Sequence, residues 1–328
     1  MATLLRGGEY ILFCNHRTLE CWSVRCSKLF WVYPKNGPKS TIQEYDADVI
    51  DGGAGVNIIV SERNRELGSS RLQIVKLDFG SGISTPLFLS EAPRQCRFSE
   101  PKICGDIAVV YFLESTRQSS SPNPRLINWK TKDHLELTSP TFQLTVIPIL
   151  NYILVLSNIL PGGPKVSILD NSAFSSHWRN VAMHPTPNKV PISELEFLLQ
   201  ESITFHDLPS LTLWGTIELF AYESPLQDET YRVWALMRDG QQNHLATKNS
   251  GGFNDRQPSC ALKYILLGTQ DIRFLEQILY FGAFGHDRGE SSDGGIVSDL
   301  SYIHISTYSG ALTCIDTTGN RVLISYYK

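Results

Sequence analysis

The stretch LLRGGEYILFCNHRTLECWSV, residues 4–24, consists of two apolar runs separated by a polar break. In the second run, the polar residue Glu20 separates Leu19 from Cys21, and the polar residue Ser23 separates Trp22 from Val24. Partial alternation of this kind is typical of a strand with one buried face. Two such runs around a short polar break predict a β-hairpin close to the first residue of the sequence.

The same pattern returns along the whole chain. Further copies of run, break and run lie at residues 57–78, 105–131, 151–170, 215–239 and 301–327. The breaks carry residues that favour tight reversals, such as Asp-Gly-Gly at 51–53 and Pro-Gly-Gly at 161–163. Helical periodicity is found mainly at residues 192–203, for which we expect a connector helix or strand.

Short strands in hairpins at wide, repeated spacing predict radial repetition of small sheets. We therefore predict an all-β fold, a degenerate β-propeller of six or seven blades in a single domain over residues 1–328. A pair of β-sandwiches is the alternative. In a propeller the first strand is expected to pair with the last blade, so residues 4–24 would meet residues 321–328.

Three tryptophans, Trp22, Trp129 and Trp234, recur at equivalent ends of the predicted strands. Aromatic side chains can form a stacking platform for nucleotides or sugars. Recurrence at equivalent positions instead favours filling of the core, and we predict that all three are core residues near blade edges.

Composition bounds the classes of function. The chain has 328 residues, of which 42% are hydrophobic and 19% charged, as in ordinary globular proteins. Its 29 basic and 33 acidic residues give a net charge of -4, which argues against a general nucleic-acid binder. Residues 144–160 are apolar, but Pro148 and Asn151 interrupt them, which favours two buried strands over a membrane span.

The first residues lack the long apolar region of a signal peptide, and none of the seven cysteines forms a C-x-x-C pair. We expect reduced thiols in a cytoplasmic or nuclear protein, with neither a membrane nor a nucleic acid among its partners. No G-x-S-x-G elbow and no H-x-x-x-H pair occurs. We therefore expect no enzymatic activity, no catalytic or metal-binding residues and no cofactor.

One acidic segment, YDADVIDGG at residues 45–53, offers Asp46, Asp48 and Asp51 to a cation. The twelfth position of a calcium loop would be Asn57 in place of the bidentate glutamate that such loops use. A solvated turn is the favoured interpretation.

Several segments, taken in order, are similar to the C-terminal region of F-box proteins expanded in mushroom-forming (basidiomycete) fungi. They are LLRGGEYILFCNHRTLECWSV (4–24), ICGDIAVVYF (103–112), RLINWKTK (125–132), IRFL (272–275), and TYSGALTC (307–314) followed by VLISYY (322–327). The resemblance covers nearly the whole chain. It implies a propeller-like region that holds the substrate of a cullin–RING ubiquitin ligase.

In that family an N-terminal F-box binds the small ligase adaptor, whereas only three residues precede Leu4 here. The F-box is therefore expected to be missing, and adaptor binding is expected only where an F-box precedes Met1. Residues 190–203 loosely resemble the Pro-x-Glu-Leu-Leu opening of an F-box. Two residues separate Pro191 from Glu194, so the spacing is wrong and we expect no adaptor site there.

The predicted function is a non-enzymatic protein-interaction module, the substrate-receptor region of an F-box-type ubiquitin ligase component. The alternative is a propeller enzyme of the glycosidase or lactonase type, acting at the central channel. Such an enzyme would carry several acids on its inner strands. The runs YILFC, IIV, IAVVYF and YILVL, interpreted as inner strands, carry none, which favours binding.

Partner contacts are expected in the longest polar loops, at residues 114–125, 239–259 and 285–295, because functional loops lie on rigid scaffolds. Within these loops we predict as partner-binding residues Arg256, His286, Asp287 and Arg288. The sequence does not identify the bound protein.

Overall fold

The computed structural model describes residues 2–64, 66–92, 94–114, 122–139, 144–159, 163–183 and 186–202, together with the strands beyond Thr204. The chain divides into two compact units. One comprises Met1–Ile203 and Ser301–Lys328, and the other comprises Thr204–Leu300. The predicted single domain over residues 1–328 stays a prediction.

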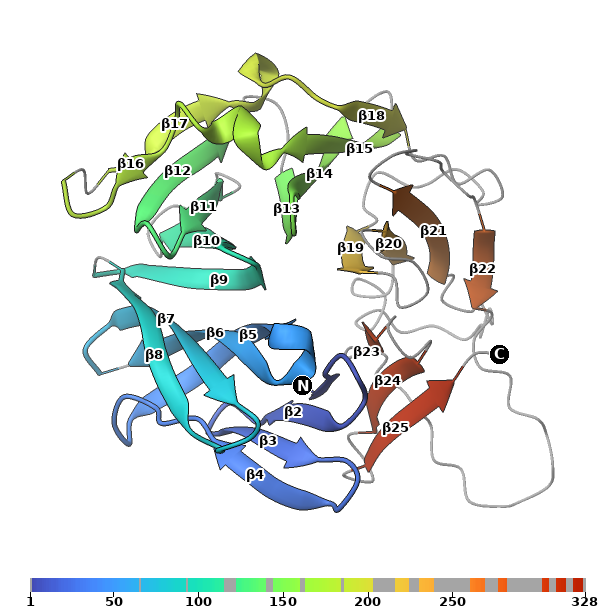
Figure 1. Ribbon diagram of the computed structural model, residues 1–328. Coiled ribbons are helices and arrows are strands. Elements are labelled where there is room, and N and C mark those ends of the chain that lie inside the picture. Colours follow the sequence, from blue (N-terminus) through green and yellow to red (C-terminus); the bar gives the residue numbers. More distant parts are fainter. Residues whose placement is uncertain are drawn as a thin grey trace, which may run out of the picture. The chain divides into compact units, whose positions relative to one another are not determined.

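The first unit is a succession of small sheets that follow the chain order, and their described strand pairs are antiparallel except for one parallel pair in the third sheet (Figure 1). The first sheet contains β1 (Ala2–Leu4), β2 (Tyr10–Cys14), β3 (Leu19–Ser23) and β4 (Lys28–Val32). The second sheet contains β5 (Ser40–Ile50), β6 (Gly55–Asn64), β7 (Ser69–Asp78) and β8 (Ser84–Glu91). In both sheets each strand pairs with the next one along the chain.

The third sheet contains β9 (Cys96–Cys104), β10 (Ile107–Glu114), β11 (Pro124–Asn128) and β12 (Asp133–Thr138). Two short strands extend it at β12, namely β16 (Arg179–Asn180) and β17 (Asn188–Pro191). The fourth sheet contains β13 (Leu144–Ile149), β14 (Tyr152–Ile159), β15 (Gly163–Asp170) and β18 (Leu199–Ser202). The chain therefore leaves the fourth sheet after β15, adds strands to the third, and returns.

The last sheet of this unit contains β23 (Ile303–Ser306), β24 (Ala311–Asp316) and β25 (Arg321–Tyr326). The second unit holds one four-stranded antiparallel sheet, made of β19 (Thr216–Glu223), β20 (Thr230–Arg238), β21 (Cys260–Gly268) and β22 (Gln277–Phe281). Among the described strands, β25 pairs only with β24, so the expected pairing with residues 4–24 is not found. The first strand, β1, instead lies beside β23 and β24.

The predicted all-β fold is confirmed, and the chain-ordered, up-and-down sheets are the blades of a degenerate β-propeller fold. The number of blades stays a prediction. Within the described residues the only helical elements are the 3₁₀ turns η1 (Asp51–Gly53), η2 (Asn171–Phe174) and η3 (Ile192–Glu194). No helix in this part of the chain has the length and apolar character needed to cross a membrane.

Residues 192–203, whose sequence has helical periodicity, form the 3₁₀ turn η3 followed by strand β18. Of the two expected connectors, the helix is therefore wrong and the strand is present. Ile192 and Leu195 are buried in the core formed by the third and fourth sheets, together with Phe174. Pairing of β18 with β15 supplies main-chain hydrogen bonds that outweigh the weak local preference of this segment for a helix.

Each core lies between successive sheets. Strand β6 is buried on both faces: Ile58 belongs to the core shared with the first sheet, and Ile59 to the core shared with the third. A strand covered on both faces is mostly apolar, which explains the continuous apolar run of residues 58–60, although the buried Asn57 interrupts the pattern. Trp129 is 8% exposed and its Nε1 donates to the Gly105 carbonyl at 3.0 Å, so the core prediction is confirmed there.

The same prediction is wrong for Trp22, which is only half-buried. Its Nε1 donates to Glu20 Oε2 at 2.9 Å, on the same strand. Both residues point away from the face that holds Leu19 and Cys21 in the core. Trp234 lies on β20, and its side chain is outside the described residues.

Candidate functional site

The predicted partner-binding residues, Arg256, His286, Asp287 and Arg288, lie outside the described residues. The same holds for the loops at 239–259 and 285–295, and for residues 115–121 of the loop at 114–125. Their role stays a prediction, and the described residues bring together two other polar assemblies.

The first assembly joins the second sheet to β9 and contains two of the three aspartates considered as cation ligands. Asp46 and Asp48 lie on strand β5, not in a solvated turn. Asp46 Oδ2 accepts from the Ile103 main-chain N–H at 2.9 Å, and Asp48 Oδ2 accepts from that of Gly105 at 2.8 Å. Glu44, two residues earlier on β5, accepts from the Glu100 N–H.

Two serines complete this assembly, which we name the β9 joint. Ser61 Oγ on β6 donates to the Phe98 carbonyl at 3.0 Å, and Ser70 Oγ on β7 accepts from the Phe98 N–H at 3.3 Å. The second sheet thus holds the main chain at β9 through side chains from three of its strands.

The acids of the β9 joint are structural acceptors. Burial raises the pKa of Asp46, while the charge of Lys102 and the Ile103 N–H act in the opposite direction. The third aspartate, Asp51, starts η1 and forms an exposed ion pair with Lys76 at 2.7 Å. Across the described ranges no cluster of His, Cys, Asp or Glu could hold a metal ion.

The second assembly is a polar cavity of about 370 Å³ at one end of the second sheet. We define the polar cavity by six of its lining residues: Asn36, Glu62, Asn64, Arg71, Glu91 and Arg94. Because the sheet is antiparallel, the end of β6, the start of β7 and the end of β8 meet there. The connections that enter and leave the sheet, around Asn36 and Arg94, line the same cavity.

Strand register places a row of charges across this end of the sheet. Arg71 on β7 lies directly opposite Glu62 on β6 and Glu91 on β8. Opposite charges on directly paired residues stabilise a sheet modestly. The row therefore sets a guanidinium between two carboxylates at the cavity.

Glu62 is the most buried charge of the row, with 1% of its surface exposed. Its Oε1 accepts from the Tyr33 hydroxyl at 2.6 Å, and its Oε2 accepts from the Asn36 main-chain N–H at 3.1 Å. Burial raises the pKa of Tyr33, and the hydrogen bond to Glu62 raises it further, so the phenol remains a donor. Glu62 thus bonds to the segment that enters the second sheet.

Arg71 has no such partner. Its Nε is buried, and none of the described residues accepts a hydrogen bond from it. Within the described part of the chain, its guanidinium forms no ion pair either. A guanidinium is a fork of donors suited to a planar carboxylate or a phosphate.

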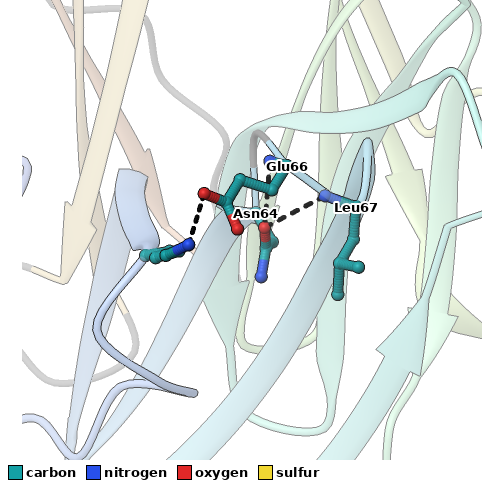
Figure 2. A network of polar contacts seen from close by, with 4 residues as sticks. Asn64, Glu66 and Leu67 are labelled. Atoms are coloured by element: carbon teal, nitrogen blue, oxygen red, sulfur yellow. Dashed lines mark hydrogen bonds and ion pairs between the residues drawn. The ribbon is translucent and has the colours of Figure 1, made fainter.

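The turn between β6 and β7, drawn in Figure 2, contributes Asn64 and Leu67 to the lining of the polar cavity. Asn64 Oδ1 accepts from the Glu66 and Leu67 main-chain N–H groups at 3.1 and 3.2 Å. Lys39 Nζ, from the segment before β5, lies 2.5 Å from Glu66 Oε1. Both partners are exposed, so this ion pair orients the turn more than it stabilises the fold.

The sequence analysis did not single out these residues. The segment SERNRELGSSR, residues 61–71, carries Glu62, Asn64 and Arg71 across one hairpin. Pairing its two strands around the turn would have set Arg71 against Glu62. The contributions of Asn36 and Arg94 depend on tertiary structure and leave no local signal.

Comparisons with known proteins concern the fold. No protein-family model matches the chain, and no curated protein matches it. Among solved structures, the WD40 domain of SCAP from fission yeast is similar with a TM-score of 0.42 and 11% identity, over 95% of this chain and 65% of that one. The chain thus spans about 65% of the length of that domain.

The Dos1 propeller gives a TM-score of 0.42 at 14% identity, over 97% of this chain and 75% of that one. Puromycin hydrolase gives 0.34 at 10% identity, over 73% of this chain and 34% of that one. At these scores and identities the similarities carry no information on function.

Proposed function

We propose that the chain is a non-enzymatic protein-interaction module, the substrate-receptor region of an F-box-type ubiquitin ligase component in the cytoplasm or nucleus. The ordered series of segments similar to fungal F-box proteins supports the ligase context. The polar cavity supports binding, and the observation that carries it is Arg71, a partly buried guanidinium that has no acceptor among the described residues. Binding residues are often placed on the loops that a rigid scaffold holds, and the turn and connections at this end of the second sheet line the polar cavity.

The alternative, a propeller enzyme of the glycosidase or lactonase type, depends on acids at inner strands. The apolar runs considered for this test belong to β2, β6, β10 and β14, which are the second strands of the first four sheets. The first strand of the second sheet, β5, does carry acids. Because Glu44, Asp46 and Asp48 accept main-chain N–H groups of the β9 joint, they give the enzyme proposal no support.

The test is a reconstitution with two matched proteins, the chain alone and the chain with an F-box fused ahead of Met1. We expect only the fused protein to bind the ligase adaptor, since Leu195 in residues 190–203 is buried in the core. Proximity labelling with both proteins is expected to enrich the same partners, and ubiquitin transfer to those partners is expected only with the fused protein.

Two results would contradict this proposal. The first is adaptor binding by the chain without an F-box. The second is a fused protein that binds the adaptor but enriches no protein beyond those found with the F-box alone. Hydrolysis of glycoside or lactone substrates by the purified chain would establish the alternative.

A further inference from the structure

We propose that the polar cavity binds a carboxylate side chain, Asp or Glu, of a partner protein, with Arg71 as its principal donor. The identification of the ligand as part of a protein rests on the proposed function above. The carboxylate chemistry rests on the cavity itself.

The first step is the unmet donor. A buried polar group without a hydrogen-bond partner destabilises a protein, and native structures contain few of them. Arg71 Nε is such a group, but its burial leaves no room beside it for a ligand oxygen. The terminal nitrogens of the same guanidinium form no hydrogen bond or ion pair with the described residues, and Arg71 lines the polar cavity. A ligand oxygen in the cavity would reach these terminal nitrogens.

The second step is that neither acid facing Arg71 in the strand register forms an ion pair with it. Glu62 faces Arg71 in the strand register, but its two oxygens accept from Tyr33 and Asn36. Glu91 also faces Arg71, yet it is exposed and no ion pair between them is formed. The protein therefore places Arg71 among carboxylates without engaging it.

The third step concerns charge. Among the described residues that line it, the polar cavity carries two guanidinium groups, of Arg71 and Arg94, and two carboxylates, of Glu62 and Glu91. The nearby acids disfavour a dianion such as a phosphate monoester more strongly than a singly charged carboxylate. A planar carboxylate can also accept two parallel hydrogen bonds from a guanidinium.

The fourth step concerns size and lining. About 370 Å³ lies near the lower end of the roughly 300–1,000 Å³ found for ligand pockets, enough for one or two side chains. Leu67 and Ala92 also line the cavity and offer apolar contact for the methylene groups of a glutamate. Leu67 is exposed on the turn, so the main chain of a bound partner peptide can lie outside the polar cavity while its side chain enters.

The first experiment uses the whole chain and the side-chain Nε–H resonances of its arginines. Butyrate, a monoanion whose chain matches the glutamate side chain from Cα to the carboxylate, is titrated in parallel with neutral butyramide and with inorganic phosphate. We expect butyrate to shift the Arg71 Nε–H, butyramide to leave it unchanged, and phosphate to act more weakly. Equal shifts with phosphate, or no shift with butyrate because water alone fills the cavity, would overturn the proposal.

The second experiment uses end-blocked fluorescent peptides, Ser-Gly-Ala-X-Ala-Gly-Ser, with Glu, Gln or Lys at X. We expect Glu to bind at least about 10-fold more tightly than Gln, as one charge-assisted hydrogen bond allows, and the preference to weaken with added salt. Arg71→Gln is expected to abolish the preference. Arg63→Gln removes the same charge from the adjoining β6 strand outside the cavity and should keep it.

Failures of the two proposals are distinguishable. Partners that are captured equally by wild type and Arg71→Gln, without any Glu preference, would leave the receptor function standing and reject the carboxylate site. A clear Glu preference with no captured partner would establish the site and reject the receptor function.

Discussion

Substitution of Asp46 separates hydrogen bonding from charge in the β9 joint. In Asp46→Ala the Ile103 N–H loses its acceptor at 2.9 Å, and Ile103 is only 5% exposed. An unsatisfied buried N–H costs about 1–3 kcal/mol, and we expect the free energy of unfolding to fall by that amount. In Asp46→Asn the amide oxygen can still accept, so we expect a loss below about 1 kcal/mol or a gain.

The pH dependence follows from the raised pKa of Asp46. The folded chain holds this proton to a higher pH than the unfolded chain, whose aspartates titrate at about 3.9. The contribution of Asp46 to stability is therefore greatest below that pH and declines as pH rises through the folded pKa. Relative to wild type, Asp46→Asn should gain stability with rising pH.

Urea unfolding followed by far-UV circular dichroism at several pH values measures both effects. Asp51→Ala is the matched control, because it removes an acid whose ion pair with Lys76 is exposed and should change stability by less than about 1 kcal/mol. Equal losses in Asp46→Ala and Asp46→Asn would refute the acceptor role. A stability difference between Asp46→Asn and wild type that is independent of pH would refute the account of the raised pKa.

Further substitutions test packing and turn geometry by the same unfolding assay. Trp129→Ala should lose about 3–5 kcal/mol as a buried aromatic, and a loss below about 1 kcal/mol would contradict its place in the core. Trp22→Ala should lose clearly less, because Trp22 is only half-buried. Tyr33→Phe removes a donor to buried Glu62 and should cost about 1–3 kcal/mol; no loss would show that the bond is dispensable. Gly82→Ala should cost about 1–2 kcal/mol, because Gly82 has a φ of +69°. A neutral result would mean that the turn adapts.

The sequence predicted the strands well because their signals are local. The alternation of Leu19 and Cys21 with polar neighbours marks one buried face, and both residues are in the core. The segment at 192–203 was ambiguous because a four-residue spacing of apolar residues is compatible with a helix. Its structure was decided by the pairing of β18 with β15, which no local pattern reports.

The candidate site was less accessible to prediction. Loop polarity and loop length predicted residues such as Arg256 and His286 as partner-binding residues. The polar cavity instead depends on which charges face each other across strands, as Arg71 and Glu62 do. Asp46 and Asp48 resembled cation ligands in sequence, and only their long-range acceptor role identifies them as structural.

The β9 joint has a consequence for how the repeats can diverge. Its hydrogen bonds reach the N–H and C=O groups of β9 and Gly105, which every residue except proline supplies in full. The side chains of β9 that face elsewhere are therefore free to change without loosening the contact between the two sheets. Adjacent repeats attached in this way can lose all recognisable similarity to one another while the scaffold persists.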